Sequence, residues 1–329
     1  MRTSLRLNND LSPAEFCALA EAAEAAGFDQ LWVSDDLMLH SATVLLTAAA
    51  TRTSRIALGC GIFNPYTVHP AELAMTAASL HELSGGRFRL GLAAGAKQFL
   101  EWVGIEQRRP LAVTRDAVTA VRALLRHELV DLPGWTDQAR LRTAVADVPI
   151  YLGAMSPKML ELAGEVADGA LPLLYPPEHF PTAKAHIETG LARAGRNPAD
   201  FDLPACVWLS LDRDRARAEA ALADKIAYYG SAFSPYLLER AGLTRADFAE
   251  IDAAGAAGDH DRARSLVDAR MLRLGIAGDV EDVLLRCRWL VDRGATHLSF
   301  GPPLGPDPRA AVELLGAEVL PALGSGEPG

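Results

Sequence analysis

The chain has 329 residues, half of them hydrophobic, with a net charge of −10 and a pI near 5.3. This length and apolar content allow a large buried core, and the negative charge argues against a nucleic-acid or anionic membrane surface as partner. No run approaches the roughly 18 apolar residues that span a bilayer, and the N-terminus lacks the apolar core of a signal peptide. The four cysteines show no CxxC spacing, as is typical of free thiols in a reducing compartment. We therefore expect a cytoplasmic protein without nucleic-acid or membrane partners.

Short apolar runs alternate with segments of helical periodicity along the chain. Ser12 and Glu15 form a capping-box pattern that predicts the start of the first helix, and Gly27 is placed to end it. The strand-like runs are nearly continuous in apolar residues, which favours a parallel sheet covered on both faces. Eight runs are predicted as strands, at residues 3–7, 30–33, 56–62, 88–93, 149–152, 169–173, 205–211 and 296–300.

Eight strands in strand–helix order predict an α/β fold, a (β/α)₈ TIM barrel, in one domain over residues 1–323. A doubly wound sheet is the second choice, because eight strands also suit that fold. The interval 212–274 is too long for one crossover, and we expect a helical insertion there, before the last strand. The tail at 324–329 is predicted to be disordered.

The third predicted strand ends in the segment GCGIFNPYTVHP, at residues 59–70. Active sites of barrels lie at the carboxyl ends of the strands. Glycines at a strand end suit a bulge or a close backbone approach, and Asn64 and Tyr66 follow where the strand tip would meet a ligand. A strand-to-helix turn without chemistry explains the same pattern.

Two adjacent carboxylates, Asp35 and Asp36, follow the second strand. Neighbours in extended chain point to opposite sides, so one is expected at the barrel mouth and the other in an anchoring role. Desolvation of one carboxyl would raise its pKa and suit it to donate a proton. A helix N-cap beside a solvated neighbour is the competing interpretation. His40 is isolated in the loop that follows, and a structural role is the simpler hypothesis for it.

The segment after the fifth strand, GAMSPKML at residues 153–160, is predicted to begin a helix, with Ser156 as cap. Backbone N–H groups at a helix N-terminus favour an anion. Lys158 adds positive charge there, and Lys97 does so after the fourth strand. The pattern indicates a phosphate-bearing cofactor spread over these two strand ends, or an ordinary cap with solvated lysines. Rossmann, P-loop and nucleophile-elbow motifs are absent, and no metal-ligand spacing is present.

Six segments together resemble the bacterial luciferase-like superfamily of flavin- and deazaflavin-dependent oxidoreductases. Within it, the resemblance is to the methylenetetrahydromethanopterin-reductase type, which uses coenzyme F420. It implies a barrel with an insertion, often dimeric, and hydride transfer between reduced coenzyme F420 and an unsaturated or oxidised small-molecule or peptide substrate. The segments run nearly end to end, at residues 26–35, 53–70, 82–95, 109–118, 149–169 and 300–308.

The resemblance also implies roles for residues at the strand ends. A non-prolyl cis peptide is expected at Gly61–Ile62, in a bulge that supports the central ring of the cofactor from behind. By the same resemblance Asp35 and Asn64 would touch the ring. The other expected cofactor contacts are Ala94, Gly95, Lys97, Gly153, Ala154, Met155, Ser156, Lys158 and Met159.

Two departures from the family pattern concern proton transfer. Asp36 stands where many deazaflavin-dependent relatives carry a histidine, and Ala96 stands where several carry an acidic residue. The family's proton donor therefore does not carry over, and we expect a substrate other than that of the methanopterin enzymes. Asp36 is our first candidate for the donor, and His40 and Tyr66 are the others.

Three alternatives remain open from the sequence. An FMN-dependent monooxygenase of the same superfamily would use oxygen and place an oxygen atom in the product. A barrel that binds a ligand without catalysis is a second alternative, to which the two missing proton donors give some weight. A phosphate-binding barrel lyase or isomerase would need metal or Schiff-base groups at the strand ends, and we find no convincing set.

Overall fold

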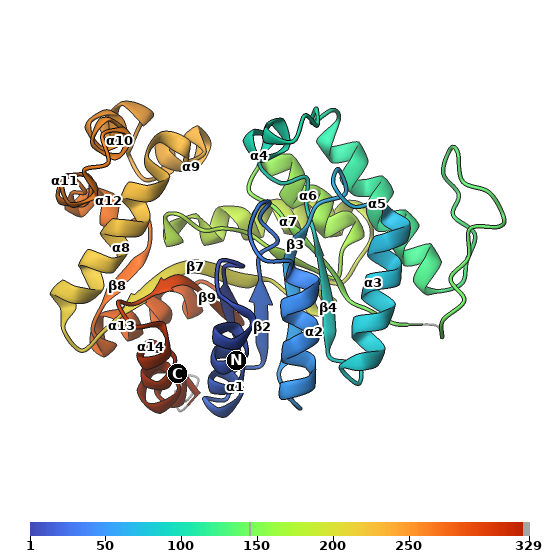
Figure 1. The fold of residues 1–329 in the computed structure, drawn as a ribbon, viewed down its shortest axis with the longest axis horizontal. Coiled ribbons are helices and arrows are strands. Elements are labelled where there is room, and N and C mark those ends of the chain that lie inside the picture. The colour runs from blue at the N-terminus through green and yellow to red at the C-terminus, as the bar shows by residue number, and fades with distance from the viewer. Residues whose placement is uncertain (145, 325–329) are drawn as a thin grey trace.

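A computed structural model of the chain, which describes residues 1–144 and 146–324, contains a ring of eight parallel strands with helices on its outside (Figure 1). The hydrogen-bonded order of the sheet is β6-β5-β4-β3-β2-β1-β9-β7-β8. Two further bridges, Gly169 to Asp202 and Leu173 to Cys206, join β6 to β7 and close the ring. The predicted (β/α)₈ barrel is thus confirmed, and the doubly wound sheet was the wrong alternative.

All eight predicted strands form the ring, and the described residues hold one strand more. The added strand, β8, has three residues and pairs only with the end of β7. A three-residue run is too short to show a periodic pattern, which is why the sequence did not reveal it. The strands are β1 (Arg2–Leu7), β2 (Gln30–Val33), β3 (Ala57–Phe63), β4 (Phe88–Leu92), β5 (Ile150–Gly153), β6 (Gly169–Leu171), β7 (Pro204–Leu211), β8 (Ile276–Gly278) and β9 (His297–Leu304).

The helices begin and end largely where local signals place them. The Ser12 hydroxyl accepts from the Glu15 N–H, the Glu15 carboxylate accepts from the Ser12 N–H, and Gly27 follows the helix with φ of +89°. The helices of the barrel are α1 (Pro13–Ala25), α2 (Ala42–Arg52), α3 (Pro70–Leu83), α4 (Lys97–Trp102), α5 (Pro110–Leu125), α6 (Pro157–Val166), α7 (Phe180–Arg193), α13 (Val280–Val291), α14 (Pro308–Leu314) and α15 (Leu320–Gly324).

The interval 212–274 is helical, as predicted, and forms the group at the upper left of Figure 1. It has an apolar core of its own, which includes Phe233, Leu237 and Phe248 and reaches Trp208 on β7. Most of the predicted tail at 324–329 lies outside the described residues, and Gly324 ends α15. The helices of the insertion are α8 (Arg215–Tyr229), α9 (Pro235–Arg240), α10 (Ala249–Ala256), α11 (His260–Ser265) and α12 (Ala269–Leu272).

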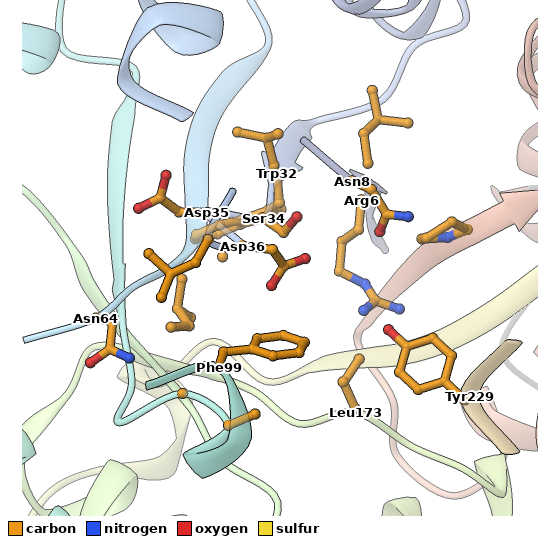
Figure 2. Close-up of a pocket in the computed structure, with 18 of the residues that line it drawn as sticks. Arg6, Asn8, Trp32, Ser34, Asp35, Asp36, Asn64, Phe99, Leu173 and Tyr229 are labelled. Carbon is orange, nitrogen blue, oxygen red and sulfur yellow. The ribbon is translucent and has the colours of Figure 1, made fainter. Parts of the chain in front are cut away.

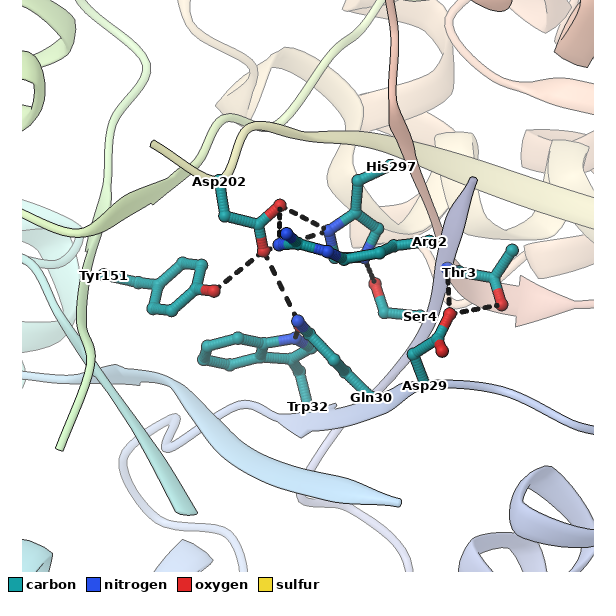
Figure 3. A network of polar contacts seen from close by, with 9 residues as sticks. All are labelled: Arg2, Thr3, Ser4, Asp29, Gln30, Trp32, Tyr151, Asp202 and His297. Carbon is teal, nitrogen blue, oxygen red and sulfur yellow. Dashed lines mark hydrogen bonds and ion pairs between the residues drawn. The ribbon is translucent and has the colours of Figure 1, made fainter. Parts of the chain in front are cut away.

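A buried polar network fills the barrel near the amino ends of its strands (Figure 3). Asp202, 8% exposed, accepts a hydrogen bond from the Tyr151 hydroxyl at 2.7 Å and lies 3.0 Å from Nδ1 of His297. Arg2 and Gln30 also contact this carboxylate, at 3.1 and 3.3 Å. Burial opposes ionisation of Asp202, but its hydrogen bonds from His297 and Tyr151 prevail and lower its pKa to about 2. The network therefore holds a charged, fully bonded carboxylate inside the barrel.

An apolar layer lies directly above this network. Its buried members are Trp32, Tyr151, Leu171 and Cys206, and Ile62 packs against them. The indole N–H of Trp32 donates to the Gln30 side chain at 2.8 Å, which ties the layer to the polar network. The barrel interior is thus filled from its amino end up to Trp32.

Within the part of the chain that the structure covers, none of the helices combines the length and the apolar character that crossing a bilayer requires.

Candidate active site

A cavity of about 240 Å³ opens at the carboxyl ends of the strands, above the layer that contains Trp32. Its walls come from the ends of β1, β2 and β3, from the turn after β4, and from α8 of the insertion. Figure 2 shows Asp36 near the middle of the cavity, with Asn64 toward one end and Arg6 and Tyr229 toward the other. Because the active sites of TIM-barrel enzymes lie at the carboxyl ends of the strands, this cavity is the candidate active site.

The end of β3 forms one wall of the cavity. The Gly61–Ile62 peptide is cis, as expected, and the pairing of β3 with β4 shifts register between Cys60 and Phe63, which confirms the predicted bulge. Gly61 and Ile62 both line the cavity. The bulge therefore presents backbone and an apolar side chain at the place where the resemblance expects the back of the cofactor ring.

Asn64 is fixed at this wall by both ends of its side-chain amide. Its Nδ2 donates to the Ala94 carbonyl at 3.0 Å, and its Oδ1 accepts from the Tyr66 N–H at 2.9 Å. Gly95 lines the cavity beside it with φ of +68°, and a Cβ at this position would lie 2.4 Å from Asn64 Nδ2. Glycine at position 95 thus leaves space in the cavity beside Asn64 and allows the Asn64 amide to keep its hydrogen bonds.

The two carboxylates after β2 point in different directions, as the extended backbone predicted (Figure 2). Asp35 accepts from the N–H of Ala42 at 3.2 Å, at the start of α2, whereas Asp36 is directed toward Arg6. Burial raises the pKa of both carboxyls. For Asp36, the hydroxyl of Ser34 and the charge of Lys225 offset part of the rise. The Asp36 side chain is exposed to the open cavity, and the surrounding protein still raises the pKa of its carboxyl above the ordinary value.

Asn9, which is fully buried, holds the loop that carries Asp36. Its Oδ1 accepts from the Asp36 N–H at 3.2 Å and from the Ser34 hydroxyl at 2.8 Å. Its Nδ2 donates to the carbonyls of Asp36 and His40, at 3.0 and 2.7 Å. Asn9 was not among the predicted site residues, because an asparagine just after a strand is also typical of an ordinary turn.

Two cations that the sequence did not single out complete the far end of the cavity. Arg6 comes from β1, and its Nη2 donates to the Val207 carbonyl at 2.7 Å. Lys225 comes from α8, with Nζ 5.1 Å from the centre of the Tyr229 ring and 5.7 Å from that of Trp208. Burial lowers the pKa of both cations and, with the charge of Asp36, raises the pKa of Tyr229 to about 12. Lys225 is one of only four lysines in the chain, and this scarcity was the only feature of the sequence that could have pointed to it as a site residue.

The other predicted catalytic candidates lie outside the cavity lining. His40 is exposed, and its backbone N–H donates to the Asn9 carbonyl at 3.0 Å. Tyr66 donates its hydroxyl to the carbonyl of Arg108, and burial raises its pKa. Neither side chain lies among those that line the cavity, whereas Asp36 does.

The predicted cofactor contacts fall into two groups. Asp35, Gly61, Ile62, Asn64 and Gly95 line the cavity together. The remaining ones lie beyond its lining, around the start of α6 and of α4, where Lys158 is exposed, Ser156 occupies the N-cap position and Lys97 pairs with Glu101 at 3.2 Å. The others in this second group are Ala94, Gly153, Ala154, Met155 and Met159.

Comparison with known proteins identifies the class. The chain belongs to the luciferase-like monooxygenase family, whose model matches residues 2–297. It is 37% identical over 306 residues to a 5,10-methylenetetrahydromethanopterin reductase from Methanolobus tindarius, covering 92% of this chain and 94% of that one. It is 34% identical to the enzyme of the same name from Archaeoglobus fulgidus, over 98% of this chain and all of that one. The coenzyme F420-dependent tetrahydromethanopterin reductase of Methanopyrus kandleri superimposes with a TM-score of 0.91 at 32% identity, over 98% of this chain and 99% of that one. The resemblance inferred from the six segments is confirmed.

Proposed function

We propose that this chain is a coenzyme F420-dependent oxidoreductase that reduces an unsaturated or oxidised carbon of a small-molecule or peptide substrate. The observation that carries the proposal is the cavity at the carboxyl ends of β2, β3 and β4, where the Gly61–Ile62 bulge, Asn64 and Gly95 face Asp36. The similarity to reductases of this kind over nearly the whole chain supports it.

The residues present fit the ring of a deazaflavin. The floor and back wall are apolar, from Trp32 and Ile62, and Phe99 and Leu173 border the same space. Because Gly95 has no side chain, the cavity beside Asn64 stays free of protein atoms at this position. The volume of about 240 Å³ lies slightly below the roughly 300–1,000 Å³ usual for whole ligands. We infer that the cavity holds the ring alone and that the tail extends toward Ser156 and Lys158 at the start of α6.

When bound in its reduced form, coenzyme F420 supplies a hydride. The chain's own part is to hold the substrate carbon beside the ring and to deliver a proton to the neighbouring atom. Asp36 suits this role because its partial desolvation in the cavity raises the pKa of its carboxyl and Asn9 fixes its backbone. After donation, the carboxylate that remains at Asp36 faces the positive charge of Lys225, which stabilises it.

A titration of the cofactor-free protein with coenzyme F420 and, separately, with FMN tests the cofactor. Two tryptophans, Trp32 and Trp208, line the cavity, so their fluorescence reports occupancy. We expect coenzyme F420 to bind at least about tenfold more tightly than FMN. Tight FMN binding without coenzyme F420 binding would overturn the proposal and favour the monooxygenase alternative, whose product carries a new oxygen atom.

We further propose that the protein is a cytoplasmic homodimer. Its four cysteines are unpaired and buried, which suits a reducing compartment. Exposed apolar side chains lie on consecutive elements of the barrel, Met38 after β2, Val44 on α2, Met75 on α3 and Trp102 on α4. Sedimentation equilibrium tests the dimer, and a monomeric mass at micromolar concentration would contradict it.

A further inference from the structure

The cavity also carries two positive charges, on Arg6 and Lys225, that form no ion pair with a carboxylate of the described residues. Among the described residues, no carboxylate oxygen lies within 4.0 Å of the charged nitrogens of Arg6 or Lys225. Burial lowers the pKa of Lys225, the more distant carboxylates of Asp10 and Asp36 raise it, and the charge of Arg6 lowers it again, so the two cations share one electrostatic environment. Unpaired like charges in a partly desolvated cavity cost free energy. Such an arrangement is expected where a ligand brings the opposite charge.

The guanidinium of Arg6 is held rigidly but is only partly satisfied. Its Nη2 donates to the Val207 carbonyl at 2.7 Å, while its Nε is buried and has no acceptor in the described structure. Gly301 on β9 lies directly against it, since a Cβ there would stand 2.4 Å from Nη2. The guanidinium is therefore held in place with N–H groups still free to donate, and an oxyanion with two acceptor oxygens, such as a carboxylate or a phosphate, matches it.

Lys225 and Tyr229 approach the same end of the cavity from α8. The ammonium of Lys225 lies over the rings of Tyr229 and Trp208 and has no hydrogen-bond acceptor among the described residues. A charge stabilised by ring faces keeps its N–H groups available to an incoming acceptor. The insertion thus adds a second cation to the one supplied by β1.

We propose that Arg6 and Lys225 form a subsite for an anionic group of the substrate, a carboxylate or a phosphate ester. Figure 2 shows Asp36 between Arg6 and Asn64, and Lys225 and Ile62 line the same cavity. An anion held at Arg6 and Lys225 therefore places the rest of the substrate across Asp36, with its reducible carbon toward the ring. The orientation of the substrate toward the ring rests on the proposed function. The binding of an anion at Arg6 and Lys225 rests only on the residues of the cavity.

The test uses matched probes of different charge, with the cofactor measured separately. Benzoate, phenyl phosphate and benzamide are titrated calorimetrically into the protein loaded with oxidised coenzyme F420. If the cofactor does not bind, the proposed function fails, and the same titrations on the cofactor-free protein still test the subsite. We expect one of the two anions to bind at least tenfold more tightly than the neutral benzamide. Equal affinity for benzamide, or no binding of either anion, would overturn the subsite.

Variants locate the binding and separate substrate from cofactor. R6Q and K225Q should each weaken the anion roughly tenfold to a hundredfold, the range for a hydrogen bond to a charged group, and leave the Kd for coenzyme F420 within twofold. An equal loss of coenzyme F420 affinity would assign the cations to the cofactor tail and overturn the proposal. G301A displaces the guanidinium without removing its charge and should also weaken the anion, which provides a test if R6Q folds poorly. Lys184, paired with Glu188 on α7, supplies the matched surface control K184Q, which should change neither affinity.

Discussion

Replacement of Gly95 by alanine tests the wall on which the proposed cofactor site depends. The new Cβ would lie 2.4 Å from Nδ2 of Asn64, so the amide must move. Movement breaks its hydrogen bonds to the Ala94 carbonyl and the Tyr66 N–H, each worth about 0.5–1.5 kcal/mol. Alanine at φ of +68° adds about 1 kcal/mol of backbone strain. We expect G95A to lower the free energy of unfolding by about 2–4 kcal/mol, measured by urea denaturation.

The chain offers a control that isolates the displaced amide from the backbone strain. Gly195, after α7, has φ of +65°, and no atom lies within 4 Å of a Cβ built there. G195A should therefore cost only the strain, about 1 kcal/mol, and leave the affinity for coenzyme F420 unchanged. G95A should weaken that affinity at least about tenfold, because the shifted Asn64 enters the space of the ring. If G95A binds coenzyme F420 as tightly as G195A does, the assignment of this wall to the cofactor is wrong.

Three further substitutions test the proton donor and the barrel interior. D36N should slow oxidation of the reduced coenzyme by about 10²–10⁴-fold with the best acceptor found. Because burial raises the pKa of Asp36, wild-type turnover should fall as pH rises through that pKa, and a D36N profile of the same shape would exclude Asp36 as the donor. N9A should lower stability by about 2–3 kcal/mol in urea and slow turnover, since it releases the loop of Asp36; full activity in N9A would show that this support is not needed. D202N should cost about 2 kcal/mol near pH 7. Its carboxyl has a pKa lowered from 3.8 to about 2, so this stabilisation is present above pH 4 and is lost as pH falls toward 2. Urea midpoints that differ equally at pH 3 and pH 7 would contradict this linkage.

Local signals in the sequence were enough for the fold and for one wall of the site. Continuous apolar runs located all eight strands of the ring, and the Ser12 pattern located the first helix. The bulge at Gly61–Ile62 was expected because glycines at a strand end combine with a family resemblance. Each of these features depends on residues close together in the sequence, which is why sequence analysis detected them.

The other wall of the site depends on contacts between distant residues. Arg6 and Lys225 lie 219 positions apart in the chain, and only the closed ring and the folded insertion bring them to one cavity. Asn9 supports Asp36 across 27 positions of sequence. An arginine in a strand and a lysine on a helix carry no local mark of such roles, so one sequence without a structure could not reveal them.

The side chains that pack the lower half of the barrel affect how Asp36, the proposed proton donor, could regain a proton. Below the cavity lie Trp32 and its buried neighbours, and beneath them lies the polar network around Asp202. Solvent at the amino end of the strands therefore meets these two layers of buried side chains along the barrel axis before Asp36. If Asp36 is the proton donor proposed above, each proton that it gives away would be replaced from the mouth, past Lys225 and Tyr229 on α8. A substrate seated there would close that route, so in this proposed mechanism one proton would be available per binding event, and reprotonation would wait for product to leave.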